Sequence, residues 1–441
     1  MEIPFWILLP FVAMLLCIAI APLVAEKEWE KNLNKFAVSM VLGSVVAIWM
    51  VANNNAENEF THKLVHQMVF DYVPFILLLT ALFVVTGGIH VKGDIQATPK
   101  VNTLILAIGF VLASLMGTTG AAMLLIRPLL ATNKQREHRV HTVLFFIALV
   151  ANCGGLLTPL GDPPLFMLFL RGAEFGWFMH LFPQWLFVGV VLLLLYFVFD
   201  TILYKKEHPT TLELDLQEHT PLRLQGKTNL FYLVGVVLAV ALVHPGNIPM
   251  MAEADAHLWI KYLREIVLLV FTSMSLYTTK RKVRYRLNKF SWAPIMEVAI
   301  LFFGIFITMT PALSYLNDHA ATLGLTKTWQ FYYATGALSS FLDNTPTAVA
   351  FHSVASGLSA EQMADFGGAI VAGIPEVLMR AICLGAVLFG SITYIGNGPN
   401  FMVKAIAEEN GVKMPSFFGY IMKFALVVLL PVYVLAQLIF L

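Results

Sequence analysis

An apolar run near residues 142–170 is interrupted at its middle by the sequence Asn152-Cys153-Gly154-Gly155-Leu156-Leu157-Thr158-Pro159-Leu160-Gly161-Asp162-Pro163-Pro164. Glycine permits unwound backbone, and proline ends a helix because it lacks an N–H donor. A second run near 375–403 is interrupted by Gly390-Ser391-Ile392-Thr393-Tyr394-Ile395-Gly396-Asn397-Gly398-Pro399-Asn400. Simple kinks need only one Pro or Gly each. The polar residues packed into both breaks therefore indicate a function.

The composition places these breaks in a membrane protein. Of 441 residues, 58% are hydrophobic and only 12% are charged, whereas about 25% are charged in ordinary soluble domains. This composition excludes a soluble enzyme and a disordered protein. A net charge of +1 also argues against nucleic acid as a partner. The three cysteines lie in apolar runs without paired spacing, so neither a disulfide framework nor a zinc site is expected.

Ten apolar runs are long enough to cross a bilayer, which requires about 20 residues. They lie near residues 3–25, 36–52, 73–91, 142–170, 181–203, 229–245, 258–278, 292–314, 375–403 and 416–440. Two further apolar stretches, 101–131 and 329–356, carry Gly, Thr, Asp, Asn and Pro at their middles. We interpret them as re-entrant hairpins, because non-helical backbone at membrane depth must be buried by protein or reached by water.

The order of these elements predicts an all-α polytopic membrane protein built from two inverted repeats. Each repeat contains five spans and one hairpin, with a broken helix at the midplane. The first repeat covers residues 1–203 and the second covers 229–441, with a cytoplasmic linker at 204–228. The hairpin tips, at Gly117 and Asp343, are separated by nearly the same stretch of sequence as the two breaks. Such repeats are common in secondary transporters, which hold their substrate near the midplane.

The charges of the loops predict the orientation. Of the 28 Lys and Arg residues, 20 fall in one group of loops and five fall in the other group. Because positive charge accumulates on the cytoplasmic side, the basic group is placed inside. The protein is then a multi-pass protein of the inner membrane, with both termini outside. The most basic loop, 279–290, is interpreted as an anchor at the cytoplasmic lipid headgroups.

The breaks and tips carry the candidate binding residues. Asp162 and Asp343 lie one in each half, and a carboxylate inside the membrane costs about 2.5–3.5 kcal/mol. Together with amide and hydroxyl oxygens they form a hard oxygen site, which suits Na⁺ and would repel an anion. The proposed cation and proton ligands are Asp343, Asn344, Thr345, Asp162, Thr158, Thr118, Thr119, Asn152, Asn397 and Asn400. Of these, Asp343, Asn344, Asp162 and Asn397 are the expected Na⁺ ligands, and Asp343 is expected to be shared between the proton and the cation.

Four motifs resemble the ion transporter superfamily, and the whole chain most resembles the NhaD-type sodium:proton antiporters. The motifs are Gly117-Thr118-Thr119-Gly120-Ala121-Ala122, Thr158-Pro159-Leu160-Gly161-Asp162-Pro163-Pro164, Ser340-Phe341-Leu342-Asp343-Asn344-Thr345-Pro346-Thr347 and Gly396-Asn397-Gly398-Pro399-Asn400. The resemblance implies a citrate-transporter-like fold and a homodimer that moves a transport domain against a scaffold. Related sodium:dicarboxylate symporters carry Ser-Asn-Thr at both tips. This chain has Gly117-Thr118-Thr119 and Asp343-Asn344-Thr345 instead, which favours the antiporter branch.

The leading hypothesis is therefore a secondary transporter that exchanges Na⁺ or Li⁺ for H⁺, without a cofactor and in contact with the lipid bilayer. The alternative is a sodium-coupled or proton-coupled carrier of a carboxylate or an oxyanion. A channel is a further alternative. An intramembrane enzyme is disfavoured because the sequence shows no nucleophile–base pair. A Gly-rich phosphate loop ending in Lys-Ser/Thr is missing from the sequence, which argues against ATP coupling.

Other polar residues have less specific interpretations. Glu376 and Arg380 are four residues apart on one expected helix, where they can form a structural ion pair. His138 and His141 are expected in a solvated cytoplasmic loop. Three acidic residues near the ends of spans are also expected to be solvated, namely Asp71, Glu174 and Asp200.

The predicted orientation is tested by labelling single cysteines from each side of intact cells. A cysteine placed in 279–290 should react only from the cytoplasmic side, and one placed in 357–366 only from outside. Labelling of 279–290 from outside would overturn the topology.

Overall fold

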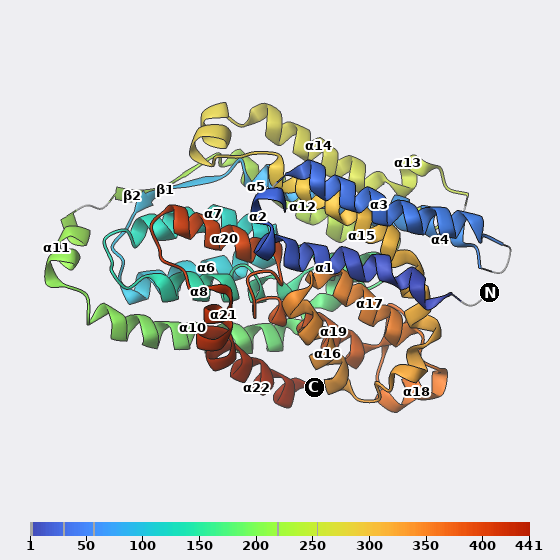
Figure 1. Cartoon of the computed structure of the whole chain (residues 1–441). Helices are drawn as coiled ribbons and strands as arrows, with labels where there is room; N and C mark the ends of the chain where they lie inside the picture. The colour runs from blue at the N-terminus through green and yellow to red at the C-terminus, as the bar shows by residue number, and fades with distance from the viewer. Residues whose placement is uncertain (1–2, 30, 56–57, 218–219, 254) are drawn as a thin grey trace.

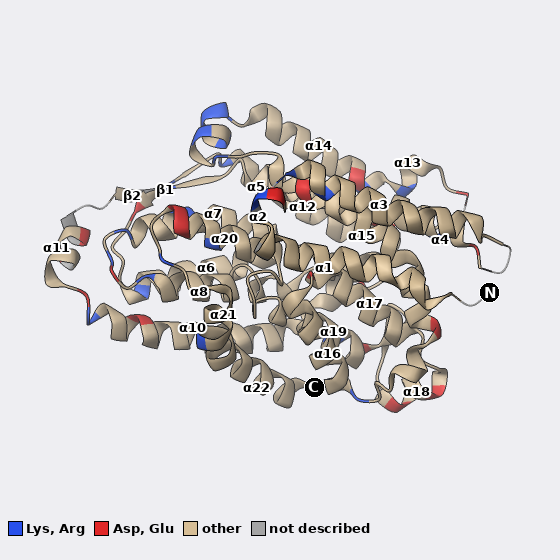
Figure 2. Ribbon diagram, viewed as in Figure 1, with Lys and Arg blue, Asp and Glu red and all other residues tan. Residues whose placement is uncertain are grey.

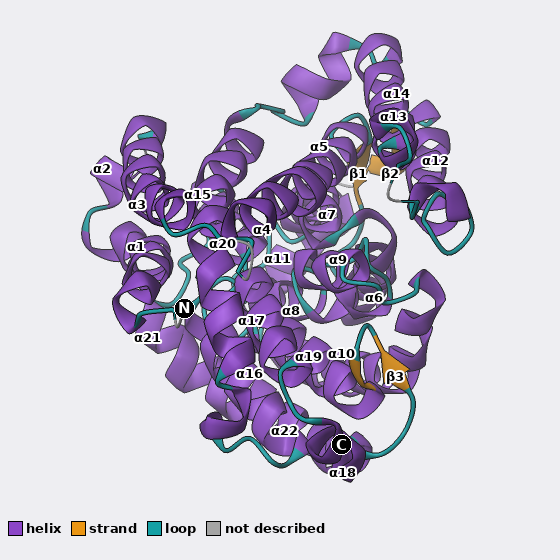
Figure 3. Cartoon of the chain, turned by 90° about the vertical axis from the view of Figure 1, so that its right-hand side faces the viewer, coloured by secondary structure: helices purple, strands orange, loops and turns teal. Residues whose placement is uncertain are grey.

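The computed structural model describes residues 3–29, 31–55, 58–217, 220–253 and 255–441, and most of them are helical (Figures 1 and 3). The helices of the first half are α1 (Leu9–Val24), α2 (Glu26–Trp29), α3 (Asn32–Ala52), α4 (Phe60–His66), α5 (Val73–Thr86), α6 (Pro99–Met116), α7 (Thr118–Thr132), α8 (Val140–Leu149), α9 (Pro163–Leu170) and α10 (Phe182–Tyr204). This architecture confirms the all-α polytopic prediction.

The linker and the second half continue in the same way. Their helices are α11 (Pro209–Gln217), α12 (Thr228–Leu242), α13 (Leu258–Lys261), α14 (Leu263–Thr278), α15 (Ala293–Asp318), α16 (Thr328–Phe341), α17 (Asn344–Ser356), α18 (Ala360–Phe366), α19 (Glu376–Phe389), α20 (Gly398–Glu409), α21 (Phe417–Tyr420) and α22 (Leu430–Phe440). Short 3₁₀ and π segments join several of them, including η2 (Gln67–Tyr72) between α4 and α5.

Within the described residues, eight helical stretches are long and apolar enough to cross a membrane. Seven of them coincide with expected spans, and the eighth, Pro99–Met116, is the first arm of the first expected hairpin. The expected spans near 229–245, 258–278 and 375–403 contain the shorter helices α12, α14 and α19. The third stretch begins at Phe60 instead of residue 73, because the helix continues backward through η2 into α4.

Two small antiparallel strand pairs were not expected from the sequence. Strand β1 (His90–Asp94) pairs with β2 (Thr220–Gln225), so that His90 lies opposite Gln225. Strand β3 (Ile370–Val371) pairs with β4 (Ile374–Pro375). The first pair ties the linker between the two halves to the loop before α6. Most of the Lys and Arg residues visible in Figure 2 lie toward the end of the molecule that carries β1, β2 and α11.

Each expected hairpin corresponds to two helices that pack against each other, α6 with α7 and α16 with α17. The first tip is Gly117, whose φ of 80° strains any residue with a side chain. The second tip is Leu342-Asp343, both residues with extended ψ angles of 162° and 136°. Each tip therefore separates two helices instead of continuing one.

In each half of the chain, one hydrogen bond joins the hairpin to the broken helix of that half. The hydroxyl of Thr158 donates to the carbonyl of Ser114, and the hydroxyl of Thr393 donates to the carbonyl of Ser340. Ser114 and Ser340 are the same number of positions apart as the hairpin tips Gly117 and Asp343. Thr158 and Thr393 are likewise the same number apart as Gly161 and Gly396 in the two breaks. The same contact therefore recurs at corresponding positions of the two halves.

The first break depends on a close backbone approach at Gly161. A Cβ atom at this position would lie 2.0 Å from the carbonyl oxygen of Gly155. The carbonyl of Gly161 also accepts a hydrogen bond from the N–H of Thr118 at 2.8 Å. This bond joins the backbone of the break to the backbone of the hairpin tip. A side chain at 161 would disturb both segments.

Gly161→Ala should therefore destabilise the protein by about 3 kcal/mol or more, because the clash is with backbone. The check is the midpoint of thermal unfolding of the purified protein, which should fall by several degrees. Gly176→Ala is the matched control, because a Cβ there has no heavy atom within 4 Å. Equal midpoints for the two variants would contradict this account.

Candidate functional site

The beginnings of four helices converge on the carboxylate of Asp162. Asp162 itself immediately precedes α9, and Asn397 immediately precedes α20. Thr118 is the first residue of α7, and Asn344 is the first residue of α17. The glycines and prolines of the tips and breaks start the helices at these positions. Helix N-termini carry partial positive charge, so their convergence favours a negative group at the centre.

Three neutral side chains donate hydrogen bonds to Asp162, which is only 1% exposed. Thr118 Oγ1 lies 2.9 Å and Asn397 Nδ2 lies 3.1 Å from Asp162 Oδ1, and Asn344 Nδ2 lies 2.6 Å from Oδ2. Among the residues that the structure describes, no Lys, Arg or His forms an ion pair with this carboxylate. Its charge is thus hydrogen-bonded but not neutralised.

Two further asparagines extend the cluster across the two halves. Asn397 Nδ2 lies 3.2 Å from Asn152 Oδ1, and Asn152 Nδ2 lies 2.7 Å from Asn400 Oδ1. Asn400 Nδ2 in turn donates to the carbonyls of Gly390 and Thr393 at 2.8 and 2.9 Å. The unwound backbone of the second break therefore orients the Asn400 amide, which contacts Asn152 in the first break.

Asp343, the residue expected to be shared by proton and cation, lies at the edge of this arrangement. It is half-buried, and its carboxylate accepts a hydrogen bond from the N–H of Thr345 at 2.9 Å. This contact is a typical helix N-cap, which accounts for an Asp at the start of α17. Asp343 makes no direct hydrogen bond to Asp162 among the described residues, and the two are linked only through Thr345 and Asn344. The structure therefore places Asn344 and Asn397 on the Asp162 carboxylate and Asp343 one step further away.

The predicted threonines have different surroundings. Thr118 contacts Asp162 directly, whereas Thr158 binds the backbone of the first hairpin. The hydroxyl of Thr345 lies 3.5 Å from Asn344 Oδ1, and can steady that amide. Thr119 is half-buried and lines the cavity described next.

A cavity of about 80 Å³ reaches Asp162 from the side of α5 and α15. Its polar wall is the first tip and the first break, with Thr118, Thr119 and Asp162. The opposite wall is apolar and includes Leu78, Leu82 and Val298. One water molecule requires about 10–15 Å³, so the cavity has room for several waters or a small ion beside the carboxylate.

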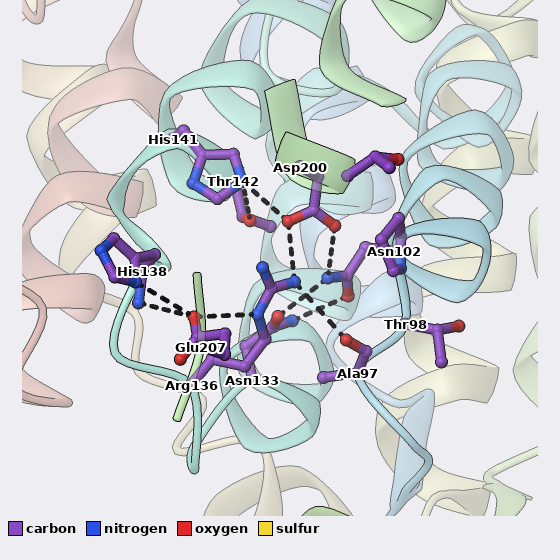
Figure 4. Close-up of polar contacts among 12 residues, drawn as sticks. Ala97, Thr98, Asn102, Asn133, Arg136, His138, His141, Thr142, Asp200 and Glu207 are labelled. Atoms are coloured by element: carbon purple, nitrogen blue, oxygen red, sulfur yellow. Dashed lines mark hydrogen bonds and ion pairs between the residues drawn. The ribbon is translucent and has the colours of Figure 1, made fainter. Parts of the chain in front are cut away.

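A second buried polar cluster lies near the linker and is shown in Figure 4. Arg136 Nη1 lies 2.7 Å from Asp200 Oδ1, and Arg136 Nε lies 3.4 Å from Glu207 Oε1. His141 Nε2 also lies 2.8 Å from Asp200 Oδ1. Asn102 Nδ2 lies 3.2 Å from Asp200 Oδ2. In contrast to Asp162, these carboxylates have a buried cationic partner.

This cluster corrects two sequence expectations. Asp200 was expected to be solvated, but its side chain is fully buried. Arg136, in the loop after α7, and His141, in α8, both contact its carboxylate. His141 is correspondingly part-buried instead of solvated. Asp71 was also expected to be solvated, but it is 8% exposed because the helix continues through η2. Glu174 is exposed as expected.

The Glu207 carboxylate stabilises the loop that precedes α8. Burial raises its pKa, but the N–H groups of Glu137 and His138 and the Arg136 guanidinium outweigh burial and lower the pKa below its usual value. A lowered folded-state pKa adds stability above the usual carboxyl pKa, and this stability is lost as the pH falls through the lowered value. The cluster should therefore be intact at neutral pH.

Two ion pairs lie in or beside the expected spans. The expected pair of Glu376 and Arg380 is confirmed, with Arg380 Nη2 3.2 Å from Glu376 Oε1. The Nε1 of Trp177 also donates to this oxygen at 3.2 Å. Sequence reasoning missed the pair of Lys35 and Glu297, whose Nζ and Oε1 atoms lie 2.7 Å apart. Lys35 is one of the 20 basic residues assigned to the cytoplasmic loops, and its partner Glu297 belongs to the other half of the chain.

With this geometry established, the comparisons with known proteins bear on its role. A family model described as "Putative citrate transport" (CitMHS_2) matches residues 1–441, the whole chain. The chain belongs to this family. No curated protein matches the sequence. The family and the apolar helices together identify a multi-pass membrane protein and a secondary transporter.

Arg136→Gln tests whether the second cluster is a structural support. Removing the guanidinium takes away the cationic partner that Asp200 and Glu207 share, which costs about 3–5 kcal/mol. The thermal unfolding midpoint at neutral pH should therefore fall strongly. Arg139→Gln is the matched control, because the Arg139 guanidinium makes long, solvent-accessible contacts with the carbonyls of Asn410 and Gly411, at 3.4 and 3.3 Å. An unchanged midpoint for Arg136→Gln would show that the cluster contributes little.

Proposed function

We propose that this transporter exchanges Na⁺ for H⁺ and that Asp162 is the group that holds the two ions in turn. The observation that carries the proposal is the fully buried Asp162 carboxylate, which accepts hydrogen bonds from three neutral donors and has no cationic partner among the described residues. A buried charge without a partner is costly. A proton or a bound cation removes that cost.

Competition between the two ions gives exchange without further machinery. A proton on Asp162 neutralises the carboxylate and removes the charge that attracts Na⁺, whereas bound Na⁺ stabilises the ionised form and expels the proton. Each ion therefore excludes the other from one site. Movement of the site between the two sides of the membrane then couples the flow of one ion to the opposite flow of the other.

The surrounding residues supply the remaining oxygen ligands in this proposal. The hydroxyl of Thr118 already lies next to the carboxylate, and Asn344 and Asn397 present their oxygens to a cation when their amides rotate. Asn152 and Asn400 orient Asn397 through the amide chain. Carboxylate, amide and hydroxyl oxygens are the ligands that hard cations prefer. Thr158, Thr119 and Thr345 position the backbone and the cavity wall.

The helix N-termini support a cation at this centre instead of an anion. Partial positive charge from four helices would attract a substrate anion if the position were vacant. Here the Asp162 carboxylate of the chain itself occupies the position and compensates those N-termini. A second anion would meet the charge of Asp162, whereas a cation or proton would be attracted to it.

The proposal reassigns the shared site within the predicted set. The Na⁺ ligands expected from the sequence were Asp343, Asn344, Asp162 and Asn397, and three of these four form the cluster. Asp343 caps α17 and thereby positions Asn344. The proposed setting is the inner membrane, with both termini outside and with the homodimer that the superfamily resemblance implies.

A carrier of a carboxylate is the second candidate, and the family's description favours it. In that mechanism Asp162 would hold the coupling Na⁺ or H⁺, and the carboxylate substrate would bind elsewhere at the tips. The two candidates differ in what is required for proton movement. An exchanger moves protons with Na⁺ alone, whereas the carrier needs the organic anion.

Proteoliposomes with an acidic interior and a pH-sensitive dye separate the candidates. Na⁺ added alone should release protons in an exchanger, and citrate alone should not. Asp162→Asn keeps the shape of the side chain but removes its charge and its titratable proton, so Na⁺ affinity should fall roughly 10- to 150-fold, the equivalent of about 1.5–3 kcal/mol, and Na⁺-driven proton release should nearly vanish. Asp343→Asn should retain exchange, because Asn is also a good N-cap.

Asp365→Asn is the matched control, because Asp365 is exposed on α18. Citrate uptake without Na⁺-driven proton flux would establish the carboxylate carrier. Normal flux in Asp162→Asn together with lost flux in Asp343→Asn would return the shared site to Asp343.

A further inference from the structure

Asp162 and Asn397 occupy equivalent places in the two halves of the chain. They are the same number of positions apart as Thr158 and Thr393, whose hydroxyls make the matching hydrogen bonds to the two hairpins. Asp162 directly precedes α9 with φ and ψ of −145° and 141°, and Asn397 directly precedes α20 with φ and ψ of −148° and 138°. The backbone that presents the carboxylate is therefore repeated, nearly unchanged, where the amide is presented.

Neither of these side chains caps the helix that it precedes. An Asp or Asn before a helix usually accepts a hydrogen bond from the first N–H groups of that helix. In the described part of the chain, Asp162 and Asn397 make no such bond to α9 or α20. They contact each other instead, with Asn397 Nδ2 3.1 Å from Asp162 Oδ1. Asp343 shows the usual behaviour, because its carboxylate caps α17. The two equivalent positions thus both contribute to one shared site.

The site at which they meet has a single carboxylate. Among the residues that the structure describes, the side chains that donate hydrogen bonds to Asp162 are the neutral Thr118, Asn344 and Asn397. Thr118 and Asn344 also occupy equivalent places, since each is the first residue of the helix that follows a hairpin tip. One half therefore supplies a carboxylate where the other half supplies an amide.

The charge of the site bears on the charge of the cation that it takes. Na⁺ neutralises one carboxylate, whereas a divalent cation would leave a net positive charge buried, which is costly. Two carboxylates would favour the divalent cation, because Ca²⁺ binds more tightly as the number of charged oxygen ligands rises. We propose that Asn397 is the specificity-determining residue of the ion site, because its neutral amide limits the site to one negative charge and so selects a monovalent cation. This inference rests on the proposed Na⁺ site at Asp162.

Exchanging the two residues tests their equivalence. Asp162→Asn should weaken Na⁺ binding about tenfold or more, measured by titration calorimetry on the full-length protein in lipid nanodiscs. The double variant Asp162→Asn/Asn397→Asp, called the exchanged pair, returns one carboxylate to the equivalent place, so most of the Na⁺ affinity should return. The recovery should be incomplete, because the Asn152 amide has to turn before it can donate to the relocated carboxylate.

Asp162→Asn/Asn410→Asp is the matched control. Asn410 directly follows α20, whereas Asn397 directly precedes it. The 12 residues of this helix, at about 1.5 Å each, separate the two positions by roughly 18 Å. The control therefore adds the same charge at the exposed end of the same helix. It should bind Na⁺ as weakly as Asp162→Asn alone.

Asn397→Asp alone tests the selectivity. With Asp162 in place, this variant has two carboxylates at the site, and it should bind Ca²⁺ about tenfold or more tightly than the wild type does. The exchanged pair keeps the charge of the wild type and should not gain Ca²⁺ affinity. Because the two measurements are independent, either variant decides the question if the other fails to fold.

The possible outcomes separate this inference from the proposed function. Undiminished Na⁺ binding in Asp162→Asn would overturn both. Na⁺ binding that is lost in Asp162→Asn and stays lost in a folded exchanged pair would overturn the inference and leave the Na⁺ site at Asp162 in place. An Asn397→Asp variant with the Ca²⁺ affinity of the wild type would also overturn the inference alone.

Discussion

The arrangement of this protein depends on one carboxylate, Asp162, held inside the membrane without a cationic partner among the described residues. Burial makes its negative charge costly, and hydrogen bonds from Thr118, Asn344 and Asn397 reduce that cost without cancelling the charge. Four helices have to begin at the same place for these donors to meet, and this requires two broken helices and two hairpins. The glycines, prolines and fastening hydrogen bonds of the tips and breaks are consequences of that requirement.

The second buried cluster shows what the chain does when a carboxylate serves structure alone. Asp200 and Glu207 are buried like Asp162, but Arg136 forms an ion pair with each of them within the protein. Each of these carboxylates thus has a cationic partner in the chain, which Asp162 lacks among the described residues. The contrast supports an ion-binding role for Asp162. The first cluster joins both halves of the chain, whereas the second lies within the first half and its linker.

Much of this organisation could be predicted from the sequence, because Gly, Pro and Asp inside apolar runs signal broken helices on their own. The contacts of Asp162 with the second half could not be, since both Asp162 and Asp343 sit in such breaks and the sequence does not show which donors reach them. The burial of Asp200 was missed because Arg136 is distant in the sequence and reaches it only after folding. The pairing of β1 with β2 was missed for the same reason, since neither strand has a partner nearby in the chain.

The most direct measurement of the central claim is the number of protons released when Na⁺ binds to the purified protein. Titration calorimetry in two buffers of different ionisation enthalpy gives this number, because released protons add the heat of the buffer to that of binding. At a pH where Asp162 is protonated in the absence of Na⁺, the account predicts release of about one proton per Na⁺ bound, and no release in Asp162→Asn. Binding heats that are identical in both buffers across the pH range, with Na⁺ still bound, would contradict it.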